Sequence, residues 1–246
     1  MTVATDSPEP RQPGRLNKAL IRLLMKRATI VASERLSDRF RLITLEGAAL
    51  ADVAWAPGHK VQIAMGSAFV ARTYTPIDWD SSAGRTRILG YAHGEGPGSD
   101  WVRAAAPGGE CDIFGPRASL DLRRLSGTLA LFGDESAIGL AYAAIHQDRT
   151  RPVACHFEVE DGESARHVMV QLGLRDAAVF ERNRGDAHVV AMEAALPALA
   201  AAGATFVLTG KAGTVQRLRQ SLKQQAIPAS RLLTKAYWAP GKTGLD

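Results

Sequence analysis

The residues with the clearest chemical potential are Arg72-Thr73-Tyr74-Thr75. Successive side chains of a strand point to opposite faces, so on a strand Arg72 and Tyr74 share one face. A guanidinium binds phosphate oxygens, a tyrosine ring stacks on a planar ring, and a hydroxyl can hydrogen-bond a heteroatom at that ring's edge. The run therefore indicates either a flavin-binding strand or a plain surface strand.

A glycine-rich loop follows at residues 91–101, YAHGEGPGSDW, with a predicted helix from Ser99. Glycines let a backbone approach a ligand closely, and the N–H groups at a helix start favour an anion such as pyrophosphate. The spacing G-x-G-x-G-S departs from the dinucleotide fingerprint G-x-G-x-x-G, and no strand-helix-strand unit surrounds it. The loop is thus either a phosphate-binding loop or a glycine-rich hairpin in which His93 is structural.

A second turn, LFGDESA at residues 131–137, joins an apolar strand to a helix. Gly133 permits the turn, and Asp134 or Ser136 can cap the helix that follows. The same turn leaves N–H groups for a nucleotide phosphate, although Asp134 and Glu135 would repel a phosphate unless their carboxylates point away.

The elements that must position these residues fall into two styles. Period-two runs predict strands at residues 28–33, 40–47, 60–65, 69–75, 85–92 and 110–114, an antiparallel six-stranded barrel. Strands at 128–133, 152–159, 204–210 and 232–238 alternate with helices at 136–146 and 214–225, around a weakly defined middle with an alanine-rich helix near 194–204, which predicts an α/β domain with a parallel sheet. We expect boundaries at 1–27, 28–124 and 125–246.

The charge is uneven along the chain. The net charge is +5, but residues 11–41 hold nine basic and two acidic side chains, so the remainder is slightly acidic. The excess lies in the N-terminal arm, which is a proline-rich leader and a predicted basic amphipathic helix within residues 1–27, and in the first predicted strands. We expect no specific nucleic-acid partner. No apolar run is long enough for a membrane-spanning helix, and no secretory signal is evident, which predicts a cytoplasmic protein without integral membrane association and, we expect, a monomer.

The two cysteines, Cys111 and Cys155, lie far apart without a CxxC or CxxxH pattern. This arrangement argues against a zinc site or a disulfide framework, and we predict no protein-bound metal.

The order of the features, RTYT, HGEGPGSDW, PGGECDIFGPRA, LFGDESA, VLTGKAGTVQRLRQSL and AYWAPGKTG, resembles the siderophore-interacting protein family of FAD-dependent ferric-siderophore reductases, relatives of the ferredoxin reductases. The resemblance covers residues 28–244. It implies a barrel that binds FAD and an α/β domain that binds NAD(P)H, either NADH or NADPH. It also implies that a ferric siderophore is reduced while the iron is chelated.

The resemblance also implies roles for individual residues. Arg72 would contact the FAD phosphate, Tyr74 would lie against the isoalloxazine, and Thr75 would bond near its reactive nitrogen. The other cofactor-binding residues implied are Thr73, Tyr91, His93, Gly94, Gly98, Ser99 and Trp101 for FAD, and Gly133, Asp134, Glu135, Ser136 and Gly210 for the nicotinamide nucleotide, with Tyr237 and Trp238 near the far side of the flavin. The siderophore candidates are Lys60, Arg117 and Lys242.

The chain departs from the family pattern at four places. Pro76-Ile77 and Ala239 stand where the family usually has arginines, and Lys211 stands where it usually has an acidic residue. A proline common after the GDES-type turn is replaced around Gly139-Leu140. The leading hypothesis is a flavin-dependent ferric-chelate reductase that releases ferrous iron. The alternatives are a flavin reductase for a non-siderophore organic acceptor, and a non-enzymatic flavin-binding module with a basic arm.

Overall fold

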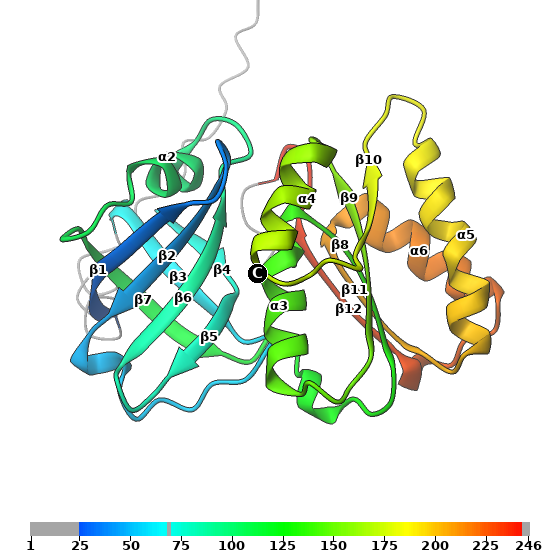
Figure 1. Ribbon diagram of the computed structural model, residues 1–246, viewed down its shortest axis with the longest axis horizontal. Helices are drawn as coiled ribbons and strands as arrows, with labels where there is room; N and C mark the ends of the chain where they lie inside the picture. The colour runs from blue at the N-terminus through cyan, green and yellow to red at the C-terminus, as the bar shows by residue number, and fades with distance from the viewer. Residues whose placement is uncertain (1–24, 68–69, 243–246) are drawn as a thin grey trace, which may run out of the picture.

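A computed structural model describes residues 25–67 and 70–242 and shows two sheets side by side (Figure 1). A barrel-like antiparallel sheet comes first and a parallel sheet flanked by helices follows. The architecture predicted from the sequence is therefore confirmed. The predicted leader and residues 16–24 of the predicted amphipathic helix lie outside the described residues.

The antiparallel sheet has seven strands and is not closed. In spatial order β4-β3-β7-β1-β2-β6-β5 its edges are β4 and β5, which follow one another in the chain across Thr75. Helix α2 (Pro97–Ala104) covers one end of the sheet (Figure 1). The strands are β1 (Lys26–Arg35), β2 (Phe40–Glu46), β3 (Lys60–Ser67), β4 (Val70–Tyr74), β5 (Pro76–Asp80), β6 (Arg85–Tyr91) and β7 (Glu110–Arg117).

Two expectations about this half are wrong. The sheet has a seventh strand, β5, which begins at Pro76; proline lacks an N–H but is tolerated at the start of an edge strand, where a missing donor costs least. Lys26 and Arg27 belong to β1 rather than to a helix. Both residues pair with β7 in the antiparallel ladder, and Arg27 also forms exposed ion pairs with Glu110 at 2.6 Å and Asp112 at 2.9 Å on that strand.

The second sheet has five parallel strands in the order β10-β9-β8-β11-β12. Its strands are β8 (Leu129–Asp134), β9 (Val153–Val159), β10 (Ala178–Glu181), β11 (Thr205–Lys211) and β12 (Leu232–Trp238). Helices α3 (Ile138–Gln147) and α4 (Gly162–Gln171) cover one face, and α5 (Ala187–Ala201) and α6 (Ala212–Gln224) cover the other (Figure 1). The weakly defined middle of the sequence thus supplies α4, β10 and α5.

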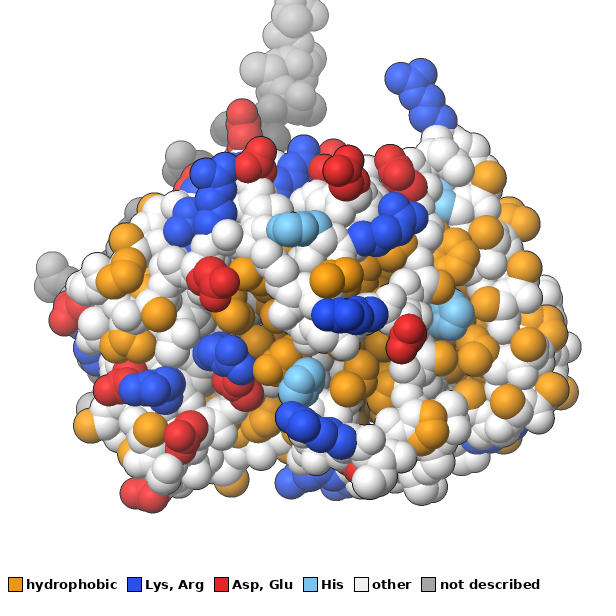
Figure 2. Space-filling model, in the orientation of Figure 1, with side chains coloured by type: hydrophobic (Ala, Val, Ile, Leu, Met, Phe, Trp, Pro, Cys, Tyr) orange, Lys and Arg blue, Asp and Glu red, His pale blue; other side chains and the backbone are white. Residues whose placement is uncertain are grey.

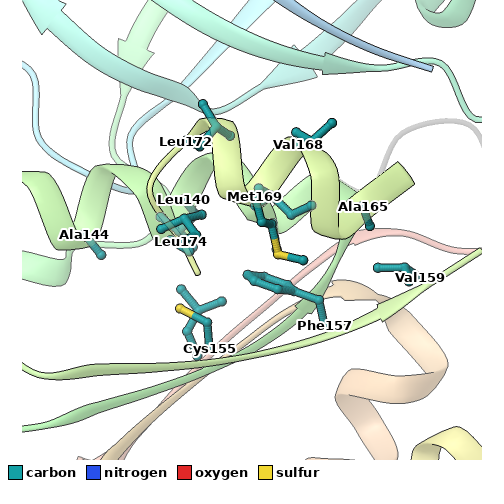
Figure 3. Close-up of a cluster of buried hydrophobic side chains, with 14 of the residues drawn as sticks. Leu140, Ala144, Cys155, Phe157, Val159, Ala165, Val168, Met169, Leu172 and Leu174 are labelled. Atoms are coloured by element: carbon teal, nitrogen blue, oxygen red, sulfur yellow. The ribbon is translucent and has the colours of Figure 1, made fainter. Parts of the chain in front are cut away.

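Buried strand residues divide between the two faces of this sheet. Leu131 and Phe157 pack toward α3 and α4, whereas their neighbours Phe132 and Phe206 pack toward α5 and α6. Figure 3 shows Met169 of α4 lying over the ring of Phe157. Two separate apolar layers therefore hold the helices onto the sheet.

The two halves of the chain share one of these layers. Leu36 and Phe40 of the first half belong to the same buried cluster as α3 and α4. Helix α3 also approaches β5 so closely that a Cβ at Gly139 would lie 2.9 Å from Ile77 Cγ2. Polar contacts join the same surfaces: Arg87 Nη2 donates to the Tyr142 hydroxyl at 3.0 Å.

The surface shows mixed charge. Figure 2 shows acidic and basic side chains intermixed over one face, with apolar side chains between them. No helix within the described ranges is long and apolar enough to cross a bilayer.

Replacing Phe157 with alanine should lower the free energy of unfolding by about 3–5 kcal/mol, because the substitution removes a fully buried ring and leaves a cavity under α4. Denaturant unfolding followed by circular dichroism measures the loss. Val170→Ala on the exposed side of α4 is the control and should change stability by less than about 0.5 kcal/mol. Equal losses in the two variants would contradict the packing described.

Candidate functional site

Arg72 and Tyr74 both face the start of α2. A Cβ on Gly98 would lie 3.1 Å from Arg72 Cγ and 3.4 Å from the Tyr74 hydroxyl, and that hydroxyl donates to the Gly98 carbonyl at 3.3 Å. The two side chains therefore share a face, as their spacing predicts. A side chain at position 98 would therefore crowd both Arg72 and Tyr74.

The Tyr74 ring is held by aromatic packing. Its centroid lies 5.3 Å from the ring of Trp101 on α2, in a tilted arrangement. Burial raises the pKa of Tyr74 far above its ordinary value. The phenol therefore stays neutral and keeps its proton for donation.

The start of α2 offers hydrogen-bond donors that this protein does not use internally. Gly96 at the N-cap makes no side-chain cap, and the buried Ser99 hydroxyl has no hydrogen-bond partner in the described structure. Gly94 and Gly96 adopt φ of 134° and 117°, with open space where a Cβ would be. Together with the Arg72 guanidinium, these groups fit a pyrophosphate. The residues present therefore fit the phosphate part of FAD.

Three other residues of the implied FAD set lie elsewhere. Thr73 is exposed and pairs with Gln62 on β3, facing away from Arg72 and Tyr74. The Tyr91 hydroxyl lies 3.3 Å from Glu135 of the second half, and its ring is 6.5 Å from that of the exposed His93. Tyr91 is thus part of the contact between the two halves.

Thr75 connects the RTYT strand to the end of β12. Its hydroxyl donates to the Tyr237 hydroxyl at 3.4 Å, across the boundary between the two sheets. Burial raises the pKa of Tyr237. The structure therefore brings together two residues that the resemblance implies for different sides of the flavin.

The Asp134 carboxylate points into the protein. Oδ1 accepts the Ser136 N–H at 2.9 Å and also the Ser136 hydroxyl, and Oδ2 accepts Trp238 Nε1 at 2.7 Å. Gly210, with φ of 95°, makes room for this carboxylate, since a Cβ there would lie 2.6 Å from Oδ2. The N–H group at this turn is already bonded to an internal anion. The turn as it stands does not fit a nucleotide pyrophosphate.

Glu135 is also buried, and Arg182 neutralises it. Arg182 Nη1 and Nη2 donate to the two Glu135 oxygens at 3.0 and 2.7 Å. Beside this pair the buried Glu158 lies 3.1 Å from His188 Nε2, and Glu158 Oε1 has no hydrogen-bond partner in the described structure.

Gly133, which precedes Asp134, also has no space for a side chain, because a Cβ there would lie 2.3 Å from Ala137 Cβ.

Sequence reasoning missed Arg182 and His188. Both come from the weakly defined middle, after β10 and at the start of α5. One signal in the sequence could have indicated Arg182. Two adjacent acidic residues after an apolar strand need a cation if they are buried, and Arg182 directly follows β10 of the same sheet.

Two of the three siderophore candidates lie together. Lys60 and Arg117 are directly opposite each other on β3 and β7. Arg117 donates to Gln62 at 2.8 Å, and its guanidinium carbon lies 4.6 Å from the centre of the Phe114 ring. The exposed Lys242 lies in the turn after β12. Across the described residues no group of three His, Cys, Asp or Glu side chains is placed to hold a metal ion.

The stability of the protein should depend on pH through Asp134. Burial is the largest cause that raises the pKa of Asp134, from 3.8 to about 6, and repulsion from Glu135 raises it further. The hydrogen bonds from Ser136 and Trp238 and the charge of Arg182 act in the opposite direction. Between pH 4 and 6 the folded state holds a proton that the unfolded state has lost, so this group lowers stability as the pH rises. Relative to wild type, Asp134→Asn should therefore gain about 2–3 kcal/mol in unfolding free energy from pH 4 to pH 7.

The control is Asp148→Asn. Asp148 makes the same kind of turn with Thr150 but is only half-buried, and hydrogen bonds from the Thr150 hydroxyl and N–H lower its pKa. Its contribution is fully present above the unfolded pKa, so the difference from wild type should stay nearly constant above pH 5. A flat difference for Asp134→Asn as well would show that the Asp134 carboxyl is not perturbed.

Comparison with known proteins gives a consistent result. Residues 62–120, which include the RTYT strand and α2, match the family model described as the siderophore-interacting FAD-binding domain. No curated protein matches the chain.

Several solved structures share the fold. The siderophore-interacting protein SipS from Aeromonas hydrophila is 19% identical with a TM-score of 0.73, covering 89% of this chain and 93% of that one. A siderophore utilization protein from T. fusca is 21% identical with a TM-score of 0.66, covering 90% and 95%. Phthalate dioxygenase reductase, described as a modular structure for electron transfer from pyridine nucleotides to [2Fe-2S], is 14% identical with a TM-score of 0.68, covering 89% and 70%. Residues 62–120 therefore match a siderophore-interacting FAD-binding domain, and the chain as a whole shares its fold with siderophore-interacting proteins and with phthalate dioxygenase reductase.

Proposed function

We propose that this protein is an FAD-dependent oxidoreductase that reduces ferric siderophores and releases ferrous iron in the cytosol. One observation carries the proposal. Arg72, Tyr74 and the unpartnered Ser99 hydroxyl surround the start of α2, within the segment that matches the FAD-binding family model. This arrangement supports a site for a flavin with a pyrophosphate.

We propose the following residue roles, which the positions of the side chains support. Arg72 and the N–H groups at the start of α2 bind the pyrophosphate, and Tyr74 lies against the flavin ring. Thr75 bonds the ring edge and Tyr237 approaches from the second domain. Bound FAD supplies the redox chemistry, since a flavin accepts electrons in pairs and passes them on singly. The siderophore holds the iron, so the protein needs no metal ligands of its own.

We propose NADH or NADPH as the electron donor, with another reductant as the alternative. The relation in fold to a reductase described as taking electrons from pyridine nucleotides supports a nicotinamide donor. The Ser136 N–H already donates to Asp134, and Glu135 is paired with Arg182. In this proposal the pyrophosphate of the nicotinamide nucleotide therefore binds away from the Ser136 N–H.

Lys60 and Arg117 are proposed to attract the anionic ferric chelate. Their side chains extend from directly opposed positions on neighbouring strands, so two positive charges lie close together. Lys242, at the far end of β12, is a third candidate. In this proposal the protein acts as a monomer.

Arg72→Met should weaken FAD binding by about tenfold to a hundredfold, because it removes charge-assisted hydrogen bonds to phosphate of about 1.5–3 kcal/mol. Titration of apoprotein with FAD, followed by flavin fluorescence, measures the affinity. Arg85→Met is the matched control, because this exposed arginine on β6 pairs with Glu46 and should leave affinity unchanged. Wild-type protein that retains no flavin after incubation with excess FAD and removal of the unbound FAD would refute the proposed function.

The FAD-loaded protein should reduce ferric siderophores, as followed by capture of ferrous iron with a ferrous-specific dye under NADH or NADPH. Lys60→Gln combined with Arg117→Gln should raise KM for an anionic ferric chelate by about threefold to tenfold, because charge steering is lost. KM for an uncharged quinone should not change. Turnover of the quinone with no reduction of any ferric chelate would identify an organic acceptor instead.

A further inference from the structure

We propose that Asp134 is a positioning residue that holds the Tyr237-Trp238 pair against Thr75, and so sets how the second domain meets the flavin. This inference rests on the proposed function, because it takes Thr75 to lie beside the flavin ring. It assigns Asp134 a role different from nucleotide binding.

The bond from Asp134 to Trp238 passes over three neighbouring strand ends. Asp134 ends β8, Gly210 lies on the adjacent β11, and Trp238 ends β12 beyond it. Asp134 is 1% exposed whereas Trp238 is 36% exposed, so the 2.7 Å bond to Trp238 Nε1 is shielded from water on the acceptor side. A hydrogen bond to a charged acceptor is stronger than one between neutral groups.

The pairing of β11 with β12 changes register at this place. Gly210 lies opposite Ala236, but the next residue, Lys211, lies opposite Trp238. Tyr237 is therefore an extra residue in β12, and an insertion of this kind re-aims the side chain that carries it. The Tyr237 hydroxyl consequently reaches Thr75 at 3.4 Å.

Gly210 is shaped for this arrangement. With φ of 95° and with only 2.6 Å from a Cβ position to Asp134 Oδ2, it leaves space for the carboxylate and nothing larger. Asp134 therefore fixes Trp238 on one side of the irregularity, while the ladder with β11 fixes Ala236 on the other. Tyr237 is held between them.

A purely local role for Asp134 is the competing explanation. Asp134 caps the turn before α3 through the N–H and hydroxyl of Ser136, as Asp148 caps its own turn through Thr150. Asp148 makes this cap without any tryptophan. Asp148→Asn is therefore a matched control that removes the same cap and leaves β12 untouched.

The first experiment uses the full chain without added flavin, labelled with nitrogen-15. The indole N–H signals of its four tryptophans are recorded, and Trp238→Phe identifies the one from Trp238. In Asp134→Asn the Trp238 signal should move to lower proton shift and exchange with solvent about tenfold faster, because a charged acceptor is lost. Asp148→Asn should leave it in place. An unchanged Trp238 signal in a folded Asp134→Asn would overturn the inference.

The second experiment loads the same variants with FAD. Asp134→Asn should bind FAD within about threefold of wild type, since the phosphate donors on α2 and β4 are intact. Its flavin fluorescence should rise, because Tyr237 and Trp238 no longer lie at a fixed place beside the ring. Gly210→Ala, which pushes the carboxylate from the other side, should give the same rise. Unchanged flavin emission in both variants would overturn the role at the flavin.

Failure of the proposed function has a different signature. If wild type binds no FAD, the proposed function and the role at the flavin both fail. The indole measurement, which needs no flavin, still decides whether Asp134 holds Trp238.

Discussion

Burial of two consecutive carboxylates at the end of β8 is the constraint on which the second half of the molecule depends. An ion removed from water costs several kcal/mol unless it is paired or hydrogen-bonded. Asp134 is compensated by Ser136 and Trp238, and Glu135 by Arg182. Each compensating group comes from a different element, so the ends of β10 and β12 and the start of α3 are all drawn to one place.

The same constraint reaches into the barrel. Glu135 lies within hydrogen-bond distance of the Tyr91 hydroxyl at the end of β6, and Arg39 pairs with Glu160 just beyond β9. The acidic turn is thus also a contact between the two sheets. The buried carboxylates of Asp134 and Glu135 must keep their partners. This requirement helps to fix the position of the end of β12 relative to the RTYT strand.

Part of this organisation can be predicted from the sequence. The alternation of side chains along a strand correctly predicts that Arg72 and Tyr74 share a face. The regular spacing of apolar residues predicts both sheets. Strand β5 is not predicted because Pro76, Asp78 and Asp80 interrupt the alternation of apolar residues that indicates a strand. At the edge of a sheet all three residues are tolerated. The inward direction of Asp134 is not predictable locally, because its partner Trp238 is 104 residues away. Arg182 and His188 are missed for the same reason: their importance comes from buried acids on other strands.

The apolar layer shared by the two halves has a consequence for synthesis of the chain on the ribosome. Leu36 and Phe40 are made early, but the α4 residues Val168 and Met169 of the same buried cluster are made far later. Until α4 emerges, the finished barrel strands carry an uncovered apolar surface. A nascent chain paused before α4 is therefore a target for chaperones or for association with other unfinished chains, whereas the completed chain closes that surface itself.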